Sequence, residues 1–113
     1  MNTLAYAERA RYVCRVAHLS DREIAQATGA GLSTVSAWLR VTHSPSGERA
    51  QRLVELSAMV ERLARVIAED YIPEWLNQPV PALDDHKPLE LLAAGEYRRV
   101  ARLISEMEAP TFT

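Results

Sequence analysis

The sequence is short of the residues that build disulfide frameworks, metal sites and membrane spans. Among its 113 residues there is one cysteine, Cys14, which excludes an internal disulfide and a cysteine-based zinc site. The three histidines are scattered without metal-ligand spacing, and no apolar run approaches the roughly 20 residues that span a bilayer. The N-terminal stretch contains an acid and no continuous apolar core, so we expect no signal peptide. These absences predict a cytoplasmic protein with no metal and no cofactor. Cys14 falls on the apolar face of the expected first helix, which predicts a buried thiol.

Charge is distributed unevenly along a chain of otherwise ordinary composition. Hydrophobic residues make up 48% and charged residues 25%, as in most globular domains. Residues 1–52 hold seven arginines against four acidic residues, a net charge of +3, whereas the remainder has a net charge of −5. A basic first half suits a phosphate backbone and an acidic second half would be repelled by one. A net charge of +3 over this length is also within ordinary variation, so charge alone does not indicate nucleic-acid binding.

Two short helices joined by a glycine turn are predicted between Ser20 and Arg40. Ser20 stands three residues before Glu23, which is the spacing of a capping box at the start of a helix. Gly29 suits the left-handed backbone conformation that ends a helix. The second helix carries apolar residues three and four apart, on a face expected to pack against the first helix: Leu32, Val35, and Trp38 or Leu39.

The spacing of Ala25, Gly29, Val35 and Trp38 resembles the helix-turn-helix of phage-repressor and Xre regulators. The resemblance implies that the second helix is a recognition helix in the major groove. Among its outward residues only Arg40 has the bidentate geometry that recognises guanine, while hydroxyls suit phosphate oxygens or a thymine methyl group. The alternative is a helical pair that serves packing or partner binding and no longer binds DNA. The candidate DNA-binding residues are Ser33, Thr34, Ser36, Arg40 and Arg49.

The rest of the chain is also predicted to be helical, which makes the fold all-α. A first helix runs from Thr3 to about Leu19, and a regular helix from Glu48 to about Glu69 either joins the two halves or pairs with another protomer. The proline-rich stretch at 77–88 is predicted to be an ordered irregular loop. A short helix then starts at Pro88, and a last helix is ended by Pro110. We therefore expect a helix-turn-helix domain at 1–47, a connecting helix at 48–70 and a C-terminal domain at 71–113. The apolar seam of the connecting helix is Leu53, Leu56, Val60, Leu63 and Ile67.

The C-terminal part carries a distinctive series of motifs. A tryptophan-leucine pair precedes a proline-bearing loop with a leucine, and Pro-Leu-Glu-Leu-Leu, a glycine and a Val-Ala-x-Leu-Ile helix follow. This series resembles the toxin-binding domain of the Xre/MbcA/ParS antitoxins. The family loop has a glycine pair where this chain has Asp84 and Asp85; aspartate tolerates a positive φ better than most residues. The matching residues are Trp75, Leu76, Leu83, Pro88, Leu89, Glu90, Leu91, Leu92, Gly95, Glu96, Tyr97, Val100, Leu103 and Ile104.

This resemblance implies the antitoxin of a type II toxin–antitoxin pair. The family's partners are RES-domain toxins that degrade NAD; the antitoxin covers the mouth of the NAD pocket, and the pair can repress its own promoter. The chain itself is expected not to be an enzyme, because it has no glycine-rich phosphate loop and no nucleophile close to a histidine base in sequence. Its expected partners are the toxin and operator DNA, in a homodimer or a larger complex with toxin, and no membrane.

Exposed aromatic anchors ringed by charge are the usual centre of a protein interface. Core packing is an equal alternative for two of the aromatic candidates, Trp75 and Tyr97, whereas Phe112 either folds back on the last helix or inserts into the partner. Inserted into a nucleotide pocket, the tail with a terminal carboxylate would mimic parts of the ligand. The candidate toxin-binding residues are Trp75, Tyr97, Arg98, Arg99, Arg102, Phe112 and Thr113.

Two other classes of function remain open from the sequence. A plain Xre-family repressor would dimerise through the leucine seam and bind operator DNA. A DNA-free interaction module would fit the sparsely charged recognition helix and the negative net charge of −2.

Overall fold

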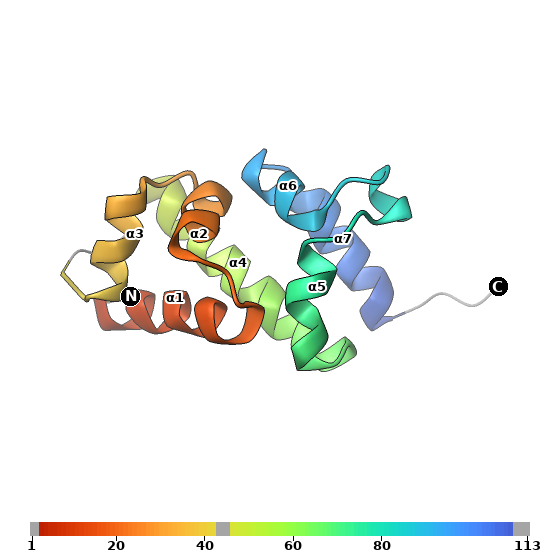
Figure 1. The fold of residues 1–113 in the computed structure, drawn as a ribbon, viewed down its shortest axis with the longest axis horizontal. Coiled ribbons are helices and arrows are strands. Elements are labelled where there is room, and N and C mark those ends of the chain that lie inside the picture. The colour runs from red at the N-terminus through yellow and green to blue at the C-terminus, as the bar shows by residue number, and fades with distance from the viewer. Residues whose placement is uncertain (1–2, 43–45, 110–113) are drawn as a thin grey trace.

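The computed structural model describes residues 3–42 and 46–109, and over these residues the chain is helical with no β-strand (Figure 1). One isolated bridge joins Val80 and His86. The all-α prediction is confirmed. In chain order the elements are α1 (Thr3–Ala17), α2 (Asp21–Thr28), α3 (Leu32–Leu39), α4 (Gly47–Val66), the 3-10 turn η1 (Glu69–Tyr71), α5 (Ile72–Leu76), the 3-10 turn η2 (Pro81–Leu83), α6 (Pro88–Ala93) and α7 (Tyr97–Glu108).

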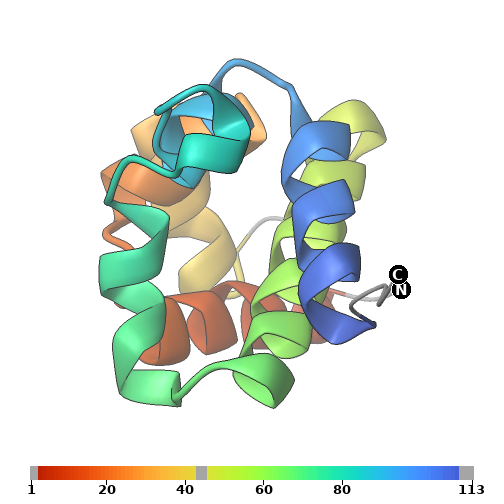
Figure 2. The same cartoon turned by 90° about the vertical axis from the view of Figure 1, so that its right-hand side faces the viewer.

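Helix α4 packs against α1 and α2 of the first half and against α5 and α7 of the second half, and the two halves also meet directly where α2 contacts α6 and α1 contacts α5 (Figure 1). Seen from the end, α7 lies alongside α4 (Figure 2). The predicted seam faces inward: Leu53, Leu56 and Leu63 are fully buried, and Ile67 packs against the same core. The seam therefore joins the two halves within one chain. Because a single cluster of buried side chains includes residues from both halves, the division into separate domains stays a prediction.

The local signals around α2 act as their chemistry predicts. The Ser20 hydroxyl accepts a hydrogen bond from the Glu23 backbone at 3.1 Å, and the Ser20 backbone donates to the Glu23 carboxylate at 3.0 Å. Gly29 ends the helix with φ +77°, a conformation in which a β-carbon is costly. The predicted capping box and glycine stop are confirmed, and together they define the start and the end of α2.

Three local predictions need correction. Helix α1 ends at Ala17 and not near Leu19, because His18 adopts a positive φ of 54°. Helix α4 ends at Val66, after which η1 turns the chain toward α5. Cys14 is half-buried and not enclosed, and this partial desolvation raises the pKa of its thiol.

The prolines of the C-terminal part begin helices and turns. Pro73 lies in the first turn of α5, Pro81 in that of η2 and Pro88 in that of α6, where the missing N–H is not needed. Their fixed φ also suits a first helical turn. Proline thus divides this region into three short helical pieces, which the sequence pattern anticipated only for the one at Pro88.

Asp84 and Asp85 form a tight turn between η2 and α6. Both adopt positive φ values, 56° and 63°, and the His86 backbone donates a hydrogen bond to the Leu83 carbonyl across them at 3.0 Å. Aspartate occupies the left-handed region more readily than most residues. The aspartates therefore adopt the backbone conformation for which glycine is the usual residue.

Tyr97 ties α7 to α2. Its side chain is 7% exposed, its hydroxyl donates to the Ala27 carbonyl, and the guanidinium of Arg52 lies over its ring, 5.7 Å from the centroid. Burial raises the pKa of the Tyr97 hydroxyl far above its usual value, so the hydroxyl remains a donor at all ordinary pH values. This contact bridges 70 positions of sequence and links the helix-turn-helix to the last helix.

Replacing Tyr97 by phenylalanine is expected to lower the free energy of unfolding by about 1–2 kcal/mol. The substitution keeps the ring but leaves the buried Ala27 carbonyl without its donor. Urea unfolding followed by circular dichroism measures the change. Tyr71→Phe is the matched control, because the Tyr71 hydroxyl accepts a bond from Gln78 in an exposed position, and its expected change is below about 0.5 kcal/mol. Equal stability of Tyr97→Phe and the wild type would contradict the prediction.

Candidate functional site

Helix α3 presents a polar face to solvent because its other face is anchored in the core. Val35 and Trp38 are 0% and 1% exposed. Of the predicted DNA-binding residues on this helix, Ser33 and Arg40 are exposed and Thr34 is half-buried. Ser36 is also half-buried, and its hydroxyl donates to the Asp21 carboxylate of α2 at 3.4 Å. Among these candidates, Ser33 and Arg40 lie on the outward face, with Thr34 and Ser36 at its edges.

Arg49 lies in the first turn of α4, close to the turn that follows α2. It lines a hollow of about 350 Å³ together with Thr28 and Gly29. Arg49 and Arg40 are both exposed, and neither forms an ion pair with a residue within the described part of the chain. With respect to the described residues, both guanidinium groups are therefore available to an anionic partner near the helix-turn-helix.

The structure corrects the prediction for Leu32. We expected Leu32 on the face that packs against α2, but its side chain is 46% exposed and lies outside the core cluster. At 3.6 residues per turn, Leu32 points roughly 90° away from the mean direction of Val35 and Trp38, and it occupies the first turn, where no preceding turn covers it. A spacing of three residues was a sound signal for an apolar face but could not show which residue stands at its edge.

Sequence reasoning also missed Arg11. Its guanidinium extends from α1 and donates a hydrogen bond of 2.7 Å to the Leu39 carbonyl at the end of α3. The last carbonyls of a helix lack intrahelical donors and carry partial negative charge, so a cation there stabilises the helix end. No sequence signal points to this contact, because its two residues are 28 positions apart.

The last helix, α7, carries the second set of predicted contacts. Val100 and Ile104 are fully buried, and Arg98 and Arg102 are exposed one turn apart on the opposite side. Neither of these two arginines forms an ion pair within residues 3–42 and 46–109. Arg99 differs, because it is half-buried and pairs with the Asp84 carboxylate at 2.9 Å and the Glu96 carboxylate at 3.4 Å.

The two predicted aromatic anchors in the described region are core residues. Trp75 is 6% exposed and Tyr97 is 7% exposed. Both belong to the common hydrophobic cluster, the packing role that the sequence left as an equal alternative. The predictions for Phe112 and Thr113 fall outside the described residues. The exposed candidates for a protein partner are therefore Arg98 and Arg102.

A groove beside Arg98 provides apolar surface between α4 and α7. It has a volume of about 290 Å³ and is lined mainly by apolar atoms, including those of Ala58, Met59 and Ala101. Arg62 and Arg98 contribute to its lining. Small apolar side chains next to guanidinium groups form a surface suited to a protein partner.

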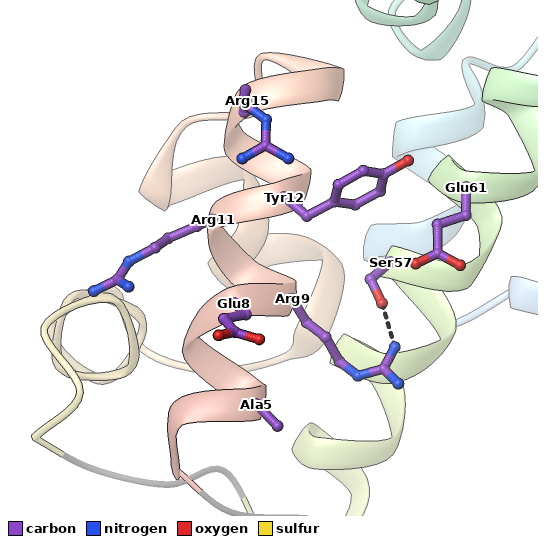
Figure 3. Close-up of a pocket in the computed structure, with 8 residues that line it drawn as sticks. All are labelled: Ala5, Glu8, Arg9, Arg11, Tyr12, Arg15, Ser57 and Glu61. Atoms are coloured by element: carbon purple, nitrogen blue, oxygen red, sulfur yellow. Dashed lines mark hydrogen bonds between the residues drawn. The ribbon is translucent and has the colours of Figure 1, made fainter.

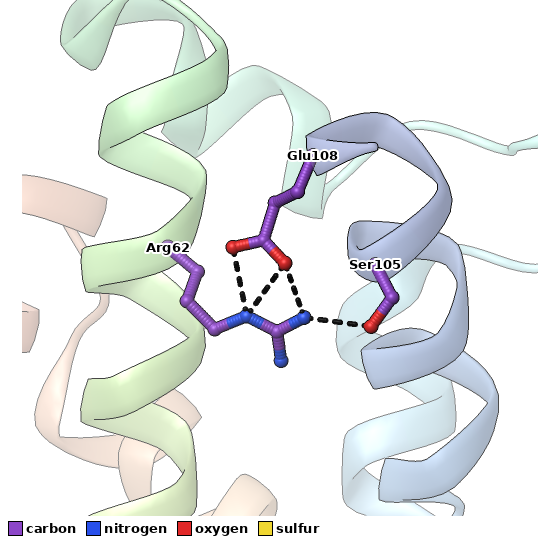
Figure 4. A network of polar contacts seen from close by, with 3 residues as sticks. All are labelled: Arg62, Ser105 and Glu108. Carbon is purple, nitrogen blue, oxygen red and sulfur yellow. Dashed lines mark hydrogen bonds and ion pairs between the residues drawn. The ribbon is translucent and has the colours of Figure 1, made fainter. Parts of the chain in front are cut away.

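The C-terminal end of α7 is clamped to α4 (Figure 4). The Arg62 guanidinium donates to both Glu108 oxygens, with a shortest distance of 2.6 Å, and to the Ser105 hydroxyl at 2.8 Å. This hydrogen bonding raises the pKa of Arg62 and lowers that of Glu108. The clamp is therefore intact above the ordinary carboxyl pKa and is lost only when the pH falls through the lowered value.

A larger groove of about 500 Å³ lies between α1 and α4 and is polar (Figure 3). Arg9 reaches across it and donates to the Ser57 hydroxyl at 2.9 Å, and Arg15 lies over the Tyr12 ring, 5.7 Å from its centroid. Glu8 and Glu61 also line it. Its charges are of both signs, so the groove does not select an anion or a cation.

The described residues offer neither a metal site nor a membrane-spanning helix. No group of three or more histidine, cysteine, aspartate or glutamate side chains is placed to hold a metal ion. No helix in the same residues has the length and apolar character needed to cross a membrane.

The fold and its two surfaces define a small all-α protein in which a helix-turn-helix shares one core with a helical C-terminal module. No family model matches the sequence. The chain is 32% identical over 94 residues to the mycobacterial cidal antitoxin MbcA of Mycobacterium tuberculosis (strain H37Rv) and, to the same extent, to that of Mycobacterium bovis; the match covers 83% of this chain and 83% of each relative. The chain belongs to the family of MbcA antitoxins.

A solved structure agrees with this assignment. The crystal structure of the M. tuberculosis MbcT-MbcA toxin-antitoxin complex contains a chain that superposes with a TM-score of 0.78. The two chains share 29% identity, and the superposition covers 95% of this chain and 96% of that one. The family resemblance inferred from the C-terminal motif is confirmed.

Proposed function

We propose that this chain is the antitoxin of a toxin–antitoxin pair and neutralises a RES-domain toxin by covering the pocket in which the toxin degrades NAD. The relatives are named antitoxins, and the matching solved structure is of a toxin–antitoxin complex. The observation in this chain that carries the proposal is the pair of exposed arginines on α7, Arg98 and Arg102, which form no ion pair with the described residues; Arg98 also lines the apolar groove against α4. On this proposal the protein acts by binding and catalyses nothing.

The geometry of α7 supports a preformed contact surface. Val100 and Ile104 fix the rotation of the helix, and the Arg62–Glu108 clamp fixes its far end against α4. The arginines are thus displayed on a rigid element, so that little conformational entropy is lost on binding. A partner with acidic side chains around an apolar protrusion would complement this surface.

Copurification with the product of the adjacent reading frame tests the proposal. A tagged version of this chain is expected to retain a RES-type toxin through size exclusion, and adding the purified chain to the toxin is expected to stop NAD consumption. Absence of a stable complex would contradict the proposal. Loss of NAD in the presence of this chain alone would instead indicate an enzyme.

A DNA-binding role in repressing its own promoter is the second part of the proposal. It is supported by the exposed face of α3, with Ser33 and Arg40, and by the exposed Arg49 beside the helix-turn-helix. An electrophoretic shift assay on the DNA upstream of its coding sequence tests this role. Binding is expected to weaken as salt rises, because each phosphate contact releases a counterion.

The alternative function, a plain dimeric repressor, required the leucine seam of α4 as its dimer interface. The seam from Leu53 to Ile67 packs inside the chain, and pairing two copies through it would require the core to open. Copurification separates the two functions, because a repressor needs only self-association and operator DNA, whereas an antitoxin needs a different protein as its partner.

A further inference from the structure

Leu32 is the most exposed large hydrophobic side chain among the described residues. The other exposed large hydrophobic side chain in this part of the chain is Tyr71, which is 37% exposed and whose hydroxyl accepts a hydrogen bond from Gln78 at 2.7 Å. Leu32 is 46% exposed and lies outside the core cluster. A single exposed leucine is common on protein surfaces, so its exposure alone indicates nothing. Its position is the informative feature.

Leu32 is the first residue of α3, the helix expected to recognise DNA. The N-terminal residues of a recognition helix are the ones that reach base edges in the major groove. Its neighbours Gly31 and Ser33 are exposed and small, so neither shields it from an approaching duplex. Leu32 therefore projects from the part of the motif where sequence is recognised.

The surrounding contacts hold Leu32 in this position. Val35 and Trp38 bury the opposite face of α3, and the Arg11 guanidinium caps its last turn at the Leu39 carbonyl. The Ser36 hydroxyl donates to Asp21 of α2. Each of these contacts restrains α3, so the orientation of its first turn is defined before DNA binds.

A leucine side chain has no hydrogen-bonding group, and the apolar group that base pairs present in the major groove is the C5-methyl group of thymine. We propose that Leu32 contacts a thymine methyl group and is a specificity-determining residue of the helix-turn-helix. The proposal rests on the DNA-binding part of the function proposed above. Arg40 lies two turns later, about 12 Å along the helix, where it meets a different base pair or a phosphate.

Replacing thymine by uracil in the upstream duplex tests the proposal, because uracil differs only by the missing methyl group. The wild-type protein is expected to bind the uracil duplex about fourfold more weakly for each thymine contacted, the factor that corresponds to burying one methyl group. Leu32→Ala is expected to bind the thymine duplex as weakly as the wild type binds the uracil duplex, and to bind both duplexes equally. Ser33→Ala, the adjacent exposed position, is the matched control and is expected to keep the distinction.

Each other outcome overturns the proposal in a recognisable way. Equal affinity of the wild type for both duplexes would show that no thymine methyl group is contacted. If Leu32→Ala still distinguished the two duplexes, the methyl contact would belong to another residue. Dissociation of a dimer by Leu32→Ala, measured by sedimentation, without a change in base preference would make Leu32 an interface between copies. Failure of the wild type to bind any duplex at low salt would refute the DNA-binding function itself. Thermal melts confirm that each variant is folded.

Discussion

Reversing Arg98 and Arg102 together to glutamate is expected to weaken the complex with the toxin by at least about 100-fold. Both guanidinium groups are exposed and unpaired within the described chain, so their interactions are available to a partner. Removal of two charge-assisted hydrogen bonds, with repulsion in their place, corresponds to about 3 kcal/mol. Isothermal titration of purified toxin with each variant measures the affinity. Renewed NAD consumption in the presence of the variant shows that the toxin is no longer inhibited.

The control for this variant has the same change in net charge at the other end of the molecule. Arg22→Glu with Arg40→Glu alters two exposed arginines of the helix-turn-helix. This pair is expected to keep its toxin affinity and to lose DNA binding, and the α7 variant is expected to show the reverse. Unchanged toxin affinity in a correctly folded Arg98→Glu, Arg102→Glu protein would remove α7 from the interface.

Arg99 was predicted from the sequence to bind the toxin together with Arg98 and Arg102, but its surroundings in the structure differ from theirs. It already pairs with Asp84 and Glu96, so part of its interaction energy is used inside the chain. Its substitution alone is expected to affect toxin binding less than that of Arg98. The distinction arises from the turn at Asp84, whose position beside α7 depends on the tertiary fold.

Features that depend on neighbours in sequence were predictable. The capping box of Ser20 and Glu23, the left-handed Gly29 and the buried spacing of Leu53, Leu56 and Leu63 all follow from short-range chemistry. Each involves residues within one or two helical turns of one another. The presence of the main helices and the class of the fold followed from such signals.

Contacts between distant residues were not predictable in the same way. The Tyr97 hydroxyl meets the Ala27 carbonyl across 70 positions, and Arg62 meets Glu108 across 46. Periodicity gave α7 an apolar face but could not distinguish a buried aromatic from a contact residue. The sequence allowed Tyr97 to contact the partner as readily as to pack in the core. Only the packing of α7 against α2 and α4 shows that Tyr97 is a core residue.

Removal of Pro110 to Thr113 is expected to raise the toxin activity that remains at a fixed antitoxin concentration by about 10-fold or more. These four residues lie beyond the clamp that fixes the end of α7, and we propose that Phe112 enters the toxin. Burying a phenylalanine side chain contributes about 1.5–3 kcal/mol. NAD consumption in titrations of toxin with full-length and truncated chains measures the difference.

The clamp gives this experiment its control. Arg62→Met keeps the four residues but releases the last turn of α7 from α4, and this variant is expected to inhibit with intermediate strength. Arg65→Met changes an exposed arginine on the same helix that acts on Glu108 only through its charge and donates no hydrogen bond to it, and this variant is expected to inhibit like the wild type. If binding depends on α7 and blocking depends on the tail, the truncated chain still copurifies with toxin while NAD is consumed. A truncated chain that inhibits fully would show that the helical surface alone closes the pocket.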